Sequence, residues 1–171
     1  TCALPICAGS AGCVMANRLT ANPEIRVCLI EAGPRDNSIF IKMPAALTFP
    51  IESDIYNWKF ESEPETELGG RTIGQARGRC LGGSSSINGM VHVRGHHKDY
   101  DNWKNLGVSG WDFADCLPFF KKLENFEDGR DPERGGHGPI SVTRSKADHP
   151  LYQRFLDAGQ QFGLKNAGDY N

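Results

Sequence analysis

The N-terminal third of the chain alternates short apolar runs with glycine-rich breaks. An apolar stretch over residues 3–7 leads into Ala8-Gly9-Ser10-Ala11-Gly12. Residues 13–20 follow; they are small and apolar with polar residues only near the end, which is typical of a helix packed closely on a sheet. Residues 25–30 are apolar at nearly every position, which favours a buried parallel strand. We therefore predict a strand–turn–helix–strand unit. Pro5 is an irregularity in it, because proline removes a ladder hydrogen bond.

The pattern over the rest of the chain predicts loops first and helices later. Residues 34–76 are loop-rich, although alternation over residues 56–61 predicts a half-exposed strand and Leu68-Gly69-Gly70-Arg71 predicts a hairpin turn. Residues 99–106 predict a short helix, and Asp112 is a suitable N-cap for a longer one in which Pro118 predicts a kink or a late start. Residues 139–143 are a candidate strand. A final helix opens at Pro150, and its apolar stripe consists of Leu151, Phe155, Ala158 and Phe162.

Composition narrows the class of protein. The 171 residues carry a formal net charge of −2, with 39% hydrophobic and 23% charged residues, which is ordinary for a globular protein and offers no basic surface for nucleic acid. No apolar run approaches the roughly 18 residues of a membrane span, so we expect no transmembrane segment, while peripheral association with a membrane stays open. The six cysteines are scattered without a metal-binding spacing, which favours a reducing compartment and hence a cytoplasmic location.

The first candidate motif is Cys7-x-Gly9-x-x-Gly12, followed by Glu31 at the end of the next predicted strand. A dinucleotide site needs a tight turn, a close approach of backbone to the pyrophosphate and a helix N-terminus with free N–H groups. An acidic residue at the tip of the second strand can bind ribose hydroxyls. Cys7 occupies the first glycine position, and a sharp turn that binds no ligand is the alternative interpretation.

The second candidate motif is the glycine- and serine-rich block over residues 78–91. Adjacent glycines followed by three serines allow backbone N–H groups and hydroxyls to converge on an anion, and Arg79 adds a charge-assisted donor. A flexible linker is the alternative, but Leu81, Ile87 and Met90 interrupt the block in a way that a linker would not.

Together these motifs resemble the glucose–methanol–choline (GMC) oxidoreductase family. The resemblance runs from about Ala8 to the end of the chain, and the block at residues 78–91 is its most specific part. Further stretches are similar to the choline dehydrogenase branch of that family: residues 43–47, 56–65, 93–96 and 99–103.

The resemblance implies FAD as the dinucleotide and oxidation of an alcohol by hydride transfer to flavin N5. It places Gly9, Ser10 and Gly12 at the pyrophosphate, and Glu31 with the adjoining Ala32 at the adenosine ribose. The block from residue 78 would line the phosphates, the ribityl chain and the isoalloxazine ring. Asn88 beside the ring offers an amide, which is a poor nucleophile for covalent attachment, so the implied FAD is non-covalent. The block's candidate residues are Arg79, Leu81, Gly82, Gly83, Ser84, Asn88, Gly89, Met90 and Val91.

The fold class that follows is α/β: an incomplete Rossmann-like FAD-binding domain with part of a second, substrate-facing α+β domain. We expect residues 1–171 to be the N-terminal FAD-binding portion of a larger flavoenzyme, with segments 36–76 and 139–171 packing toward its substrate domain. We expect no catalytic residue and little turnover from this chain alone, and a structural or surface role for His92, His96 and His97. The alcohol, with choline as the example, and the electron acceptor stay open. The alternatives are a NAD-dependent dehydrogenase and a degenerate or truncated fragment without catalysis.

Overall fold

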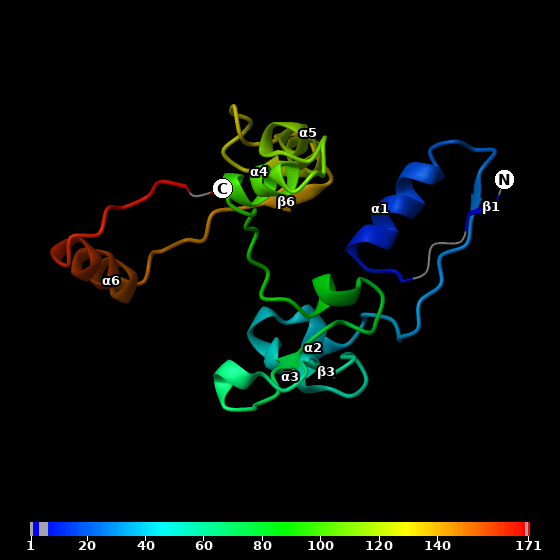
Figure 1. Cartoon of the computed structure of the whole chain (residues 1–171), viewed down its shortest axis with the longest axis horizontal. Coiled ribbons are helices and arrows are strands. Elements are labelled where there is room, and N and C mark those ends of the chain that lie inside the picture. Colours follow the sequence, from blue (N-terminus) through cyan, green and yellow to red (C-terminus); the bar gives the residue numbers. More distant parts are fainter. Residues whose placement is uncertain (1, 4–6, 170) are drawn as a thin grey trace. The chain divides into compact units, whose positions relative to one another are not determined.

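The computed structural model describes residues 2–3, 7–169 and 171, and the chain divides into two compact units, Thr1–Val91 and His92–Asn171. In the first unit, β1 (Cys2–Ala3) pairs in parallel with β2 (Arg26–Val27), and α1 (Ser10–Leu19) connects them. Figure 1 shows this β1–α1–β2 crossover at the start of the chain. It confirms the predicted strand–turn–helix–strand order, while Pro5 lies outside the described residues.

The second strand is shorter and less covered than the apolar run predicts. The ladder takes in only residues 26–27, and Ile30 is 45% exposed. A buried strand over residues 25–30 is therefore a wrong prediction for this unit. An apolar run becomes buried only between neighbouring strands and under helices, and the described part of this sheet has two strands.

Residues 34–76 contain short helices where loop was predicted. They are α2 (Ile39–Lys42), the 3-10 helix η1 (Pro44–Ala46) and α3 (Thr48–Glu52). The Ser38 hydroxyl caps α2 by accepting a hydrogen bond from the Phe40 N–H at 3.3 Å, and the rings of Phe40 and Phe49 stack at 4.8 Å. The predicted hairpin is confirmed: β3 (Phe60–Glu61) and β4 (Gly74–Gln75) are antiparallel, with η2 (Thr66–Leu68) near the tip.

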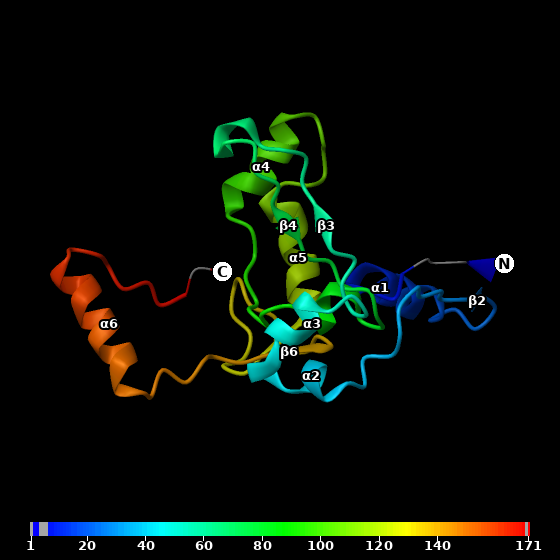
Figure 2. The ribbon, with the colours of Figure 1, turned by 90° about the horizontal axis from the view of Figure 1, so that it is seen from below.

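The second unit contains the predicted later helices. These are α4 (His97–Asn105), α5 (Phe113–Leu123) and α6 (Pro150–Gln161), visible in Figure 2. Asp112 caps α5 as predicted, because its carboxylate accepts from the Asp115 N–H at 2.9 Å, and α5 begins at Phe113 with Pro118 inside it rather than starting late. The strands β5 (Glu124–Phe126) and β6 (Ile140–Val142) pair in parallel and contribute the buried Phe126 and Val142.

Aromatic side chains join α4 to α5. The imidazole of His97 stacks on Phe113 with ring centroids 3.6 Å apart, and Tyr100 meets Phe120 edge to face at 5.6 Å. None of the helices in the described part of the chain is both long and apolar enough to traverse a bilayer.

Candidate functional site

The N-terminus of α1 is free of any side-chain cap. Gly9 is its N-cap in extended conformation, and no side chain accepts from the N–H groups of the first turn. Such a helix end carries unsatisfied donors and a partial positive charge, the two properties that bind a phosphate. Gly12 has no room for a side chain, because a Cβ there would lie 1.9 Å from the Cys7 carbonyl oxygen. The structure therefore brings Gly9, Ser10 and Gly12 together as the motif predicts.

Cys7 stands in the turn with a backbone conformation that favours glycine. Its φ is +87°, and its N–H donates to the Ile30 carbonyl at 2.7 Å, which fastens the turn to the end of the second strand. A non-glycine residue in this region of φ carries a cost of about 1–2 kcal/mol. The geometry of the first glycine position is thus kept although the glycine itself is replaced.

The two glycine-rich motifs meet through their backbones. The Gly82 N–H donates to the Ala8 carbonyl at 2.8 Å, and a Cβ on Gly83 would lie 2.9 Å from the Gly9 Cα. Gly82 and Gly83 both have positive φ, +88° and +55°. Residues far apart in the sequence therefore form one continuous cradle of backbone.

A second layer of close approaches supports this cradle. A Cβ on Gly33 would lie 1.9 Å from the Arg79 carbonyl oxygen, and a Cβ on Gly78 would lie 2.1 Å from the Gly83 carbonyl oxygen. The Leu81 N–H donates to the Pro34 carbonyl at 3.0 Å. The turn after β2 thus packs directly on the block at residues 78–91.

Glu31 connects the turn that precedes α1 with the turn that follows β2. Its carboxylate accepts from the Ala8 N–H at 2.8 Å and from the Gly33 N–H at 2.9 Å, and Ala32 lies exposed between them. These bonds place the carboxylate beside the α1 turn, where the motif predicts a ribose-binding acid. Burial is the main cause that raises the pKa of the neighbouring Cys80 thiol, and the charges of Glu31 and Asp36 add to it.

The serine hydroxyls of the block bond within the block. Ser84 Oγ accepts from the Gly78 N–H at 3.0 Å, Ser85 Oγ donates to the Gly82 carbonyl at 2.6 Å and Ser86 Oγ donates to the Leu81 carbonyl at 2.7 Å. They were expected to converge on an anion. In this structure they shape the turn, and the donors left for an anion are backbone N–H groups and the Ser84 hydroxyl, which only accepts within the block.

Arg79 is a cation without a carboxylate partner among the described residues. Its guanidinium lies over the Trp58 ring at 5.4 Å from the centroid, and its Nε is buried without a hydrogen-bond partner. Its own N–H donates to the Tyr56 carbonyl at 2.7 Å. An unsatisfied buried donor on a cation fits an anionic ligand.

Asn88, Gly89, Met90 and Val91 form an exposed segment at the end of the block. The Asn88 Oδ1 accepts from the Met90 N–H at 2.9 Å, and Met90 has a positive φ of +57°. Asn88 and Met90 line a pocket of about 300 Å³ together with Ser85, Ser86 and side chains from residues 36–50. The candidate ring-side residues therefore border a cavity, whereas Val91 is 76% exposed.

Asn57 is a site residue that the sequence did not reveal. It is buried, its Nδ2 donates to the Ile51 carbonyl at 2.5 Å, and its Oδ1 accepts from the N–H groups of Lys59 and Arg77, both at 2.9 Å. It therefore fixes the strand that enters the block at Gly78. The sequence signals were a polar residue between two aromatic ones and the family resemblance of residues 56–65, neither of which gave Asn57 a role.

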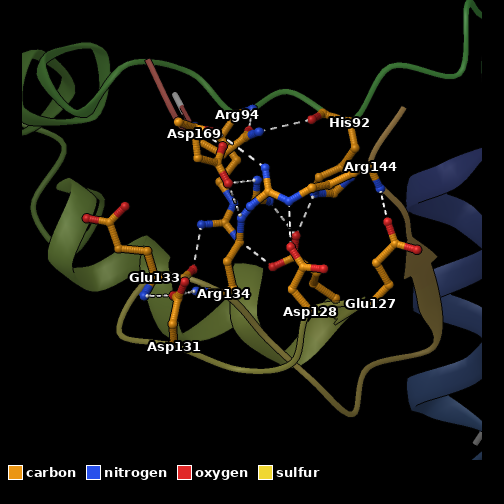
Figure 3. Close-up of polar contacts among 12 residues, drawn as sticks. His92, Arg94, Glu127, Asp128, Asp131, Glu133, Arg134, Arg144 and Asp169 are labelled. Carbon is orange, nitrogen blue, oxygen red and sulfur yellow. Dashed lines mark hydrogen bonds and ion pairs between the residues drawn. The ribbon is translucent and has the colours of Figure 1, made fainter. Parts of the chain in front are cut away.

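A second missed feature is the buried cluster of charges around Glu124 in the other unit. Its members include Arg94, Arg134 and Asp169, drawn in Figure 3. His92 lies 3.5 Å from Glu124, His96 caps α4 by accepting from the Lys98 N–H at 3.2 Å, and His97 stacks on Phe113. These contacts support the structural role expected for the three histidines.

Comparison with known proteins places this geometry in a family. The chain is 52% identical over 166 residues to the oxygen-dependent choline dehydrogenase of Photobacterium profundum, covering 96% of this chain and 29% of that protein. It resembles the crystal structure of pyridoxine 4-oxidase from Mesorbium loti at a TM-score of 0.85 and 34% identity, covering 96% of this chain and 33% of the other. An FAD-dependent oxidoreductase from Chaetomium thermophilum matches at a TM-score of 0.80 and 32% identity, covering 96% and 30%.

The chain thus spans about 30% of the length of the curated relatives that it matches. The α/β fold predicted from the sequence is confirmed as the N-terminal, FAD-binding type of domain found in these oxidoreductases. The assignment of segments 36–76 and 139–171 to a substrate domain stays a prediction. The GMC oxidoreductase family model matches residues 3–171, and the chain belongs to that family.

Proposed function

We propose that this chain binds FAD non-covalently and is the cofactor-binding portion of an oxidoreductase that oxidises an alcohol such as choline. The observation that carries the proposal is the junction of the Gly9–Gly12 turn with the block at residues 78–91, at the uncapped end of α1. The FAD-dependent neighbour and the choline dehydrogenase relatives support the same cofactor and the same class of reaction.

The residues present fit the pyrophosphate of this cofactor. Gly12 and Gly83 let the two motifs pack backbone against backbone, because a Cβ on either would collide with Cys7 or Gly9, and the first turn of α1 presents uncapped donors. Arg79 brings a positive charge with an unsatisfied Nε. Glu31 beside the same turn is the candidate partner of the adenosine ribose, with Ala32 next to it.

Asn88, Gly89, Met90 and Val91 are the candidate neighbours of the isoalloxazine ring, with Leu81 and Ser84 nearer the ribityl chain and phosphates. When bound, the flavin would supply the hydride acceptor for alcohol oxidation. This chain's own residues would bind and orient it. An amide at Asn88 can hydrogen-bond the ring edge but does not form the covalent link.

FAD binding is tested by titrating the purified chain with FAD, while NAD is titrated in parallel. We expect quenching of flavin fluorescence and a higher melting temperature with FAD alone. A melting temperature raised only by NAD would favour a NAD-dependent dehydrogenase, and no response to either would favour the degenerate fragment. Release of all flavin from the denatured chain would show that binding is non-covalent.

The matched control is a pair of glycine variants. In Gly12→Ala the new Cβ would collide with the Cys7 carbonyl oxygen, whereas in Gly74→Ala it meets no atom within 4 Å. We expect the first variant to lose FAD binding and the second to keep it. Equal affinities in the two variants would contradict a pyrophosphate site at α1.

Alcohol oxidation is tested separately by mixing the FAD-loaded chain with choline in the absence of oxygen. The pocket bordered by Asn88 and Met90 has no histidine among its lining residues, so the described side chains there offer no imidazole base. We expect no bleaching of the flavin absorbance. Rapid bleaching would show that the chain contains a complete catalytic site.

A further inference from the structure

The carboxylate of Glu124 is fully buried and surrounded by donors. It accepts from Arg94 Nη2 at 2.7 Å, from Arg134 Nη1 at 2.6 Å and from the Gly135 N–H at 2.9 Å, with His92 Nε2 at 3.5 Å. Its side chain has 0% exposure. A buried charge of this kind is stable only while its partners are in place, because removal of one partner leaves an uncompensated charge in the interior.

Arg134 links the buried Glu124 to Asp169, near the end of the chain. Its Nη1 binds Glu124, while its Nε and Nη2 donate to Asp169 Oδ2 at 3.1 and 2.6 Å. Asn171 adds a second attachment, since its Oδ1 accepts from the Arg94 N–H at 2.7 Å and its Nδ2 donates to the His92 carbonyl at 3.2 Å. Figure 3 shows Arg134 between the acidic side chains of this cluster.

Arg144, which precedes α6, makes a second set of contacts that hold the residues following α6. Its N–H donates to Glu127, its Nε donates to Asp128, and its Nη1 donates to the Gly168 carbonyl at 3.3 Å. Residue 144 and residue 168 are therefore joined directly. Residues 145–167, which we name the α6 excursion, leave and return at this one point.

Packing of α6 does not account for the placement of the α6 excursion. The helix has no buried residue, and Leu151, Phe155 and Phe162 are 70%, 79% and 86% exposed. Burial of an apolar stripe is the usual way in which a helix is fixed on its domain. In this unit the polar contacts at the two ends take that role.

We propose that Glu124, Arg94, Arg134, Arg144, Asp169 and Asn171 form a clasp that closes the α6 excursion, so that breaking its outer contacts releases residues 145–171 as one segment while α4, α5 and β5 stay folded. The inner contacts of Glu124 with Arg94 and Arg134 are buried, whereas Asp169 has a side-chain exposure of 32%. Opening would therefore begin at Asp169.

The test measures amide hydrogen exchange by NMR on the chain with Asp169→Asn. Two amides report on the two ends of the clasp: Arg94 N–H, which donates to Asn171, and Arg144 N–H, which donates to Glu127 while the Arg144 guanidinium binds the Gly168 carbonyl. We expect both to exchange at least tenfold faster, with the amides of α4 and α5 unchanged. Asn171→Ala, which leaves the ion pairs in place, should accelerate the same two amides and serves as the second variant if Asp169→Asn unfolds the unit.

The control is Asp157→Asn, which removes an exposed ion pair with Arg154 inside α6. We expect it to leave both reporting amides unchanged. Acceleration confined to Arg94, or equal acceleration throughout α4 and α5, in both clasp variants would overturn the proposal. The first result would show that the two ends are independent, and the second that the cluster holds the whole unit.

Discussion

Gly9 and Gly83 lie back to back, with only 2.9 Å between the Gly9 Cα and the position that a Cβ on Gly83 would occupy. Each glycine belongs to a different motif. The approach depends on Gly83, because a Cβ on Gly9 would lie at an ordinary 3.8 Å from the Gly83 Cα. The cradle proposed to hold FAD therefore requires bare backbone at position 83.

The first prediction concerns Gly83→Ala. The new Cβ would press on backbone rather than on a flexible side chain, and Gly83 has a φ of +55° that costs a non-glycine residue about 1–2 kcal/mol. We expect a fall of at least that size in the free energy of unfolding and at least a tenfold weaker Kd for FAD. Chemical denaturation and flavin titration measure the two effects, and wild-type values for both would refute the back-to-back contact.

The second prediction is that Cys7→Gly raises the stability of the protein and its affinity for FAD. Glycine removes the cost of the +87° φ. We expect about 1 kcal/mol of added stability and tighter FAD binding. Cys28→Gly is the matched control, because Cys28 has an ordinary φ and its replacement should destabilise the chain. An unchanged FAD affinity in Cys7→Gly would favour the degenerate fragment.

The third prediction concerns the charge of Arg79. In Arg79→Gln the cation with the unpartnered Nε is lost, and charge-assisted hydrogen bonds are worth about 1.5–3 kcal/mol. We expect a Kd for FAD that is at least tenfold weaker and less dependent on salt than that of the wild type. Arg154→Gln removes an arginine from the exposed surface of α6 and should change neither property. If both variants behave alike, Arg79 does not face the phosphates.

The fourth prediction is a pH dependence of stability that depends on Asp169. Burial acts to raise the pKa of this carboxyl, but the hydrogen bonds from Arg134 and from the Asn171 N–H outweigh it and hold the pKa at about 2. Because the folded-state pKa lies below the ordinary value of 3.8, the stabilising contribution is present above pH 4. It is lost as the pH falls from about 4 to about 2.

The size of this effect is limited by exposure. The lowering of the pKa from 3.8 to about 2 corresponds to at most about 2–3 kcal/mol at 1.36 kcal/mol per pH unit, and solvent screening at a 32% exposed side chain reduces it further. Urea unfolding of wild type and Asp169→Asn between pH 2 and pH 6 measures it. We expect the two curves to converge at pH 2; a constant gap over the whole range would mean that the ion pair does not titrate as described.

The local sequence pattern predicted the helices and the hairpin better than it predicted the tertiary contacts between them. The helix after Asp112, the hairpin at Gly69-Gly70 and the crossover through α1 follow from caps, turn residues and periodicity, which act within a few residues. Gly9 and Gly83 were recognised as parts of two motifs. Their contact depends on tertiary packing, and no spacing in the sequence encodes it.

Charged residues were the hardest to predict. Glu124 follows Lys121-Lys122-Leu123 and has the local pattern of the solvated end of a helix. Its burial depends on Arg134 and Arg94, which are 10 and 30 residues away in the sequence. Short apolar segments led to the opposite error, because burial was predicted where the structure shows exposure. Ile30 belongs to an apolar run that predicts burial, yet it is 45% exposed.

The hydrogen bonds that the serines make within the block at residues 78–91 affect how fast and how tightly a ligand binds. Ser84, Ser85 and Ser86 already hold the turn in shape through bonds to Gly78, Gly82 and Leu81. A preorganised turn loses little conformational entropy when a ligand arrives, so more of the contact energy becomes affinity. Alanine at position 85 or 86 would leave every backbone donor of the turn in place and act chiefly by slowing association, since the loop would first have to find its shape.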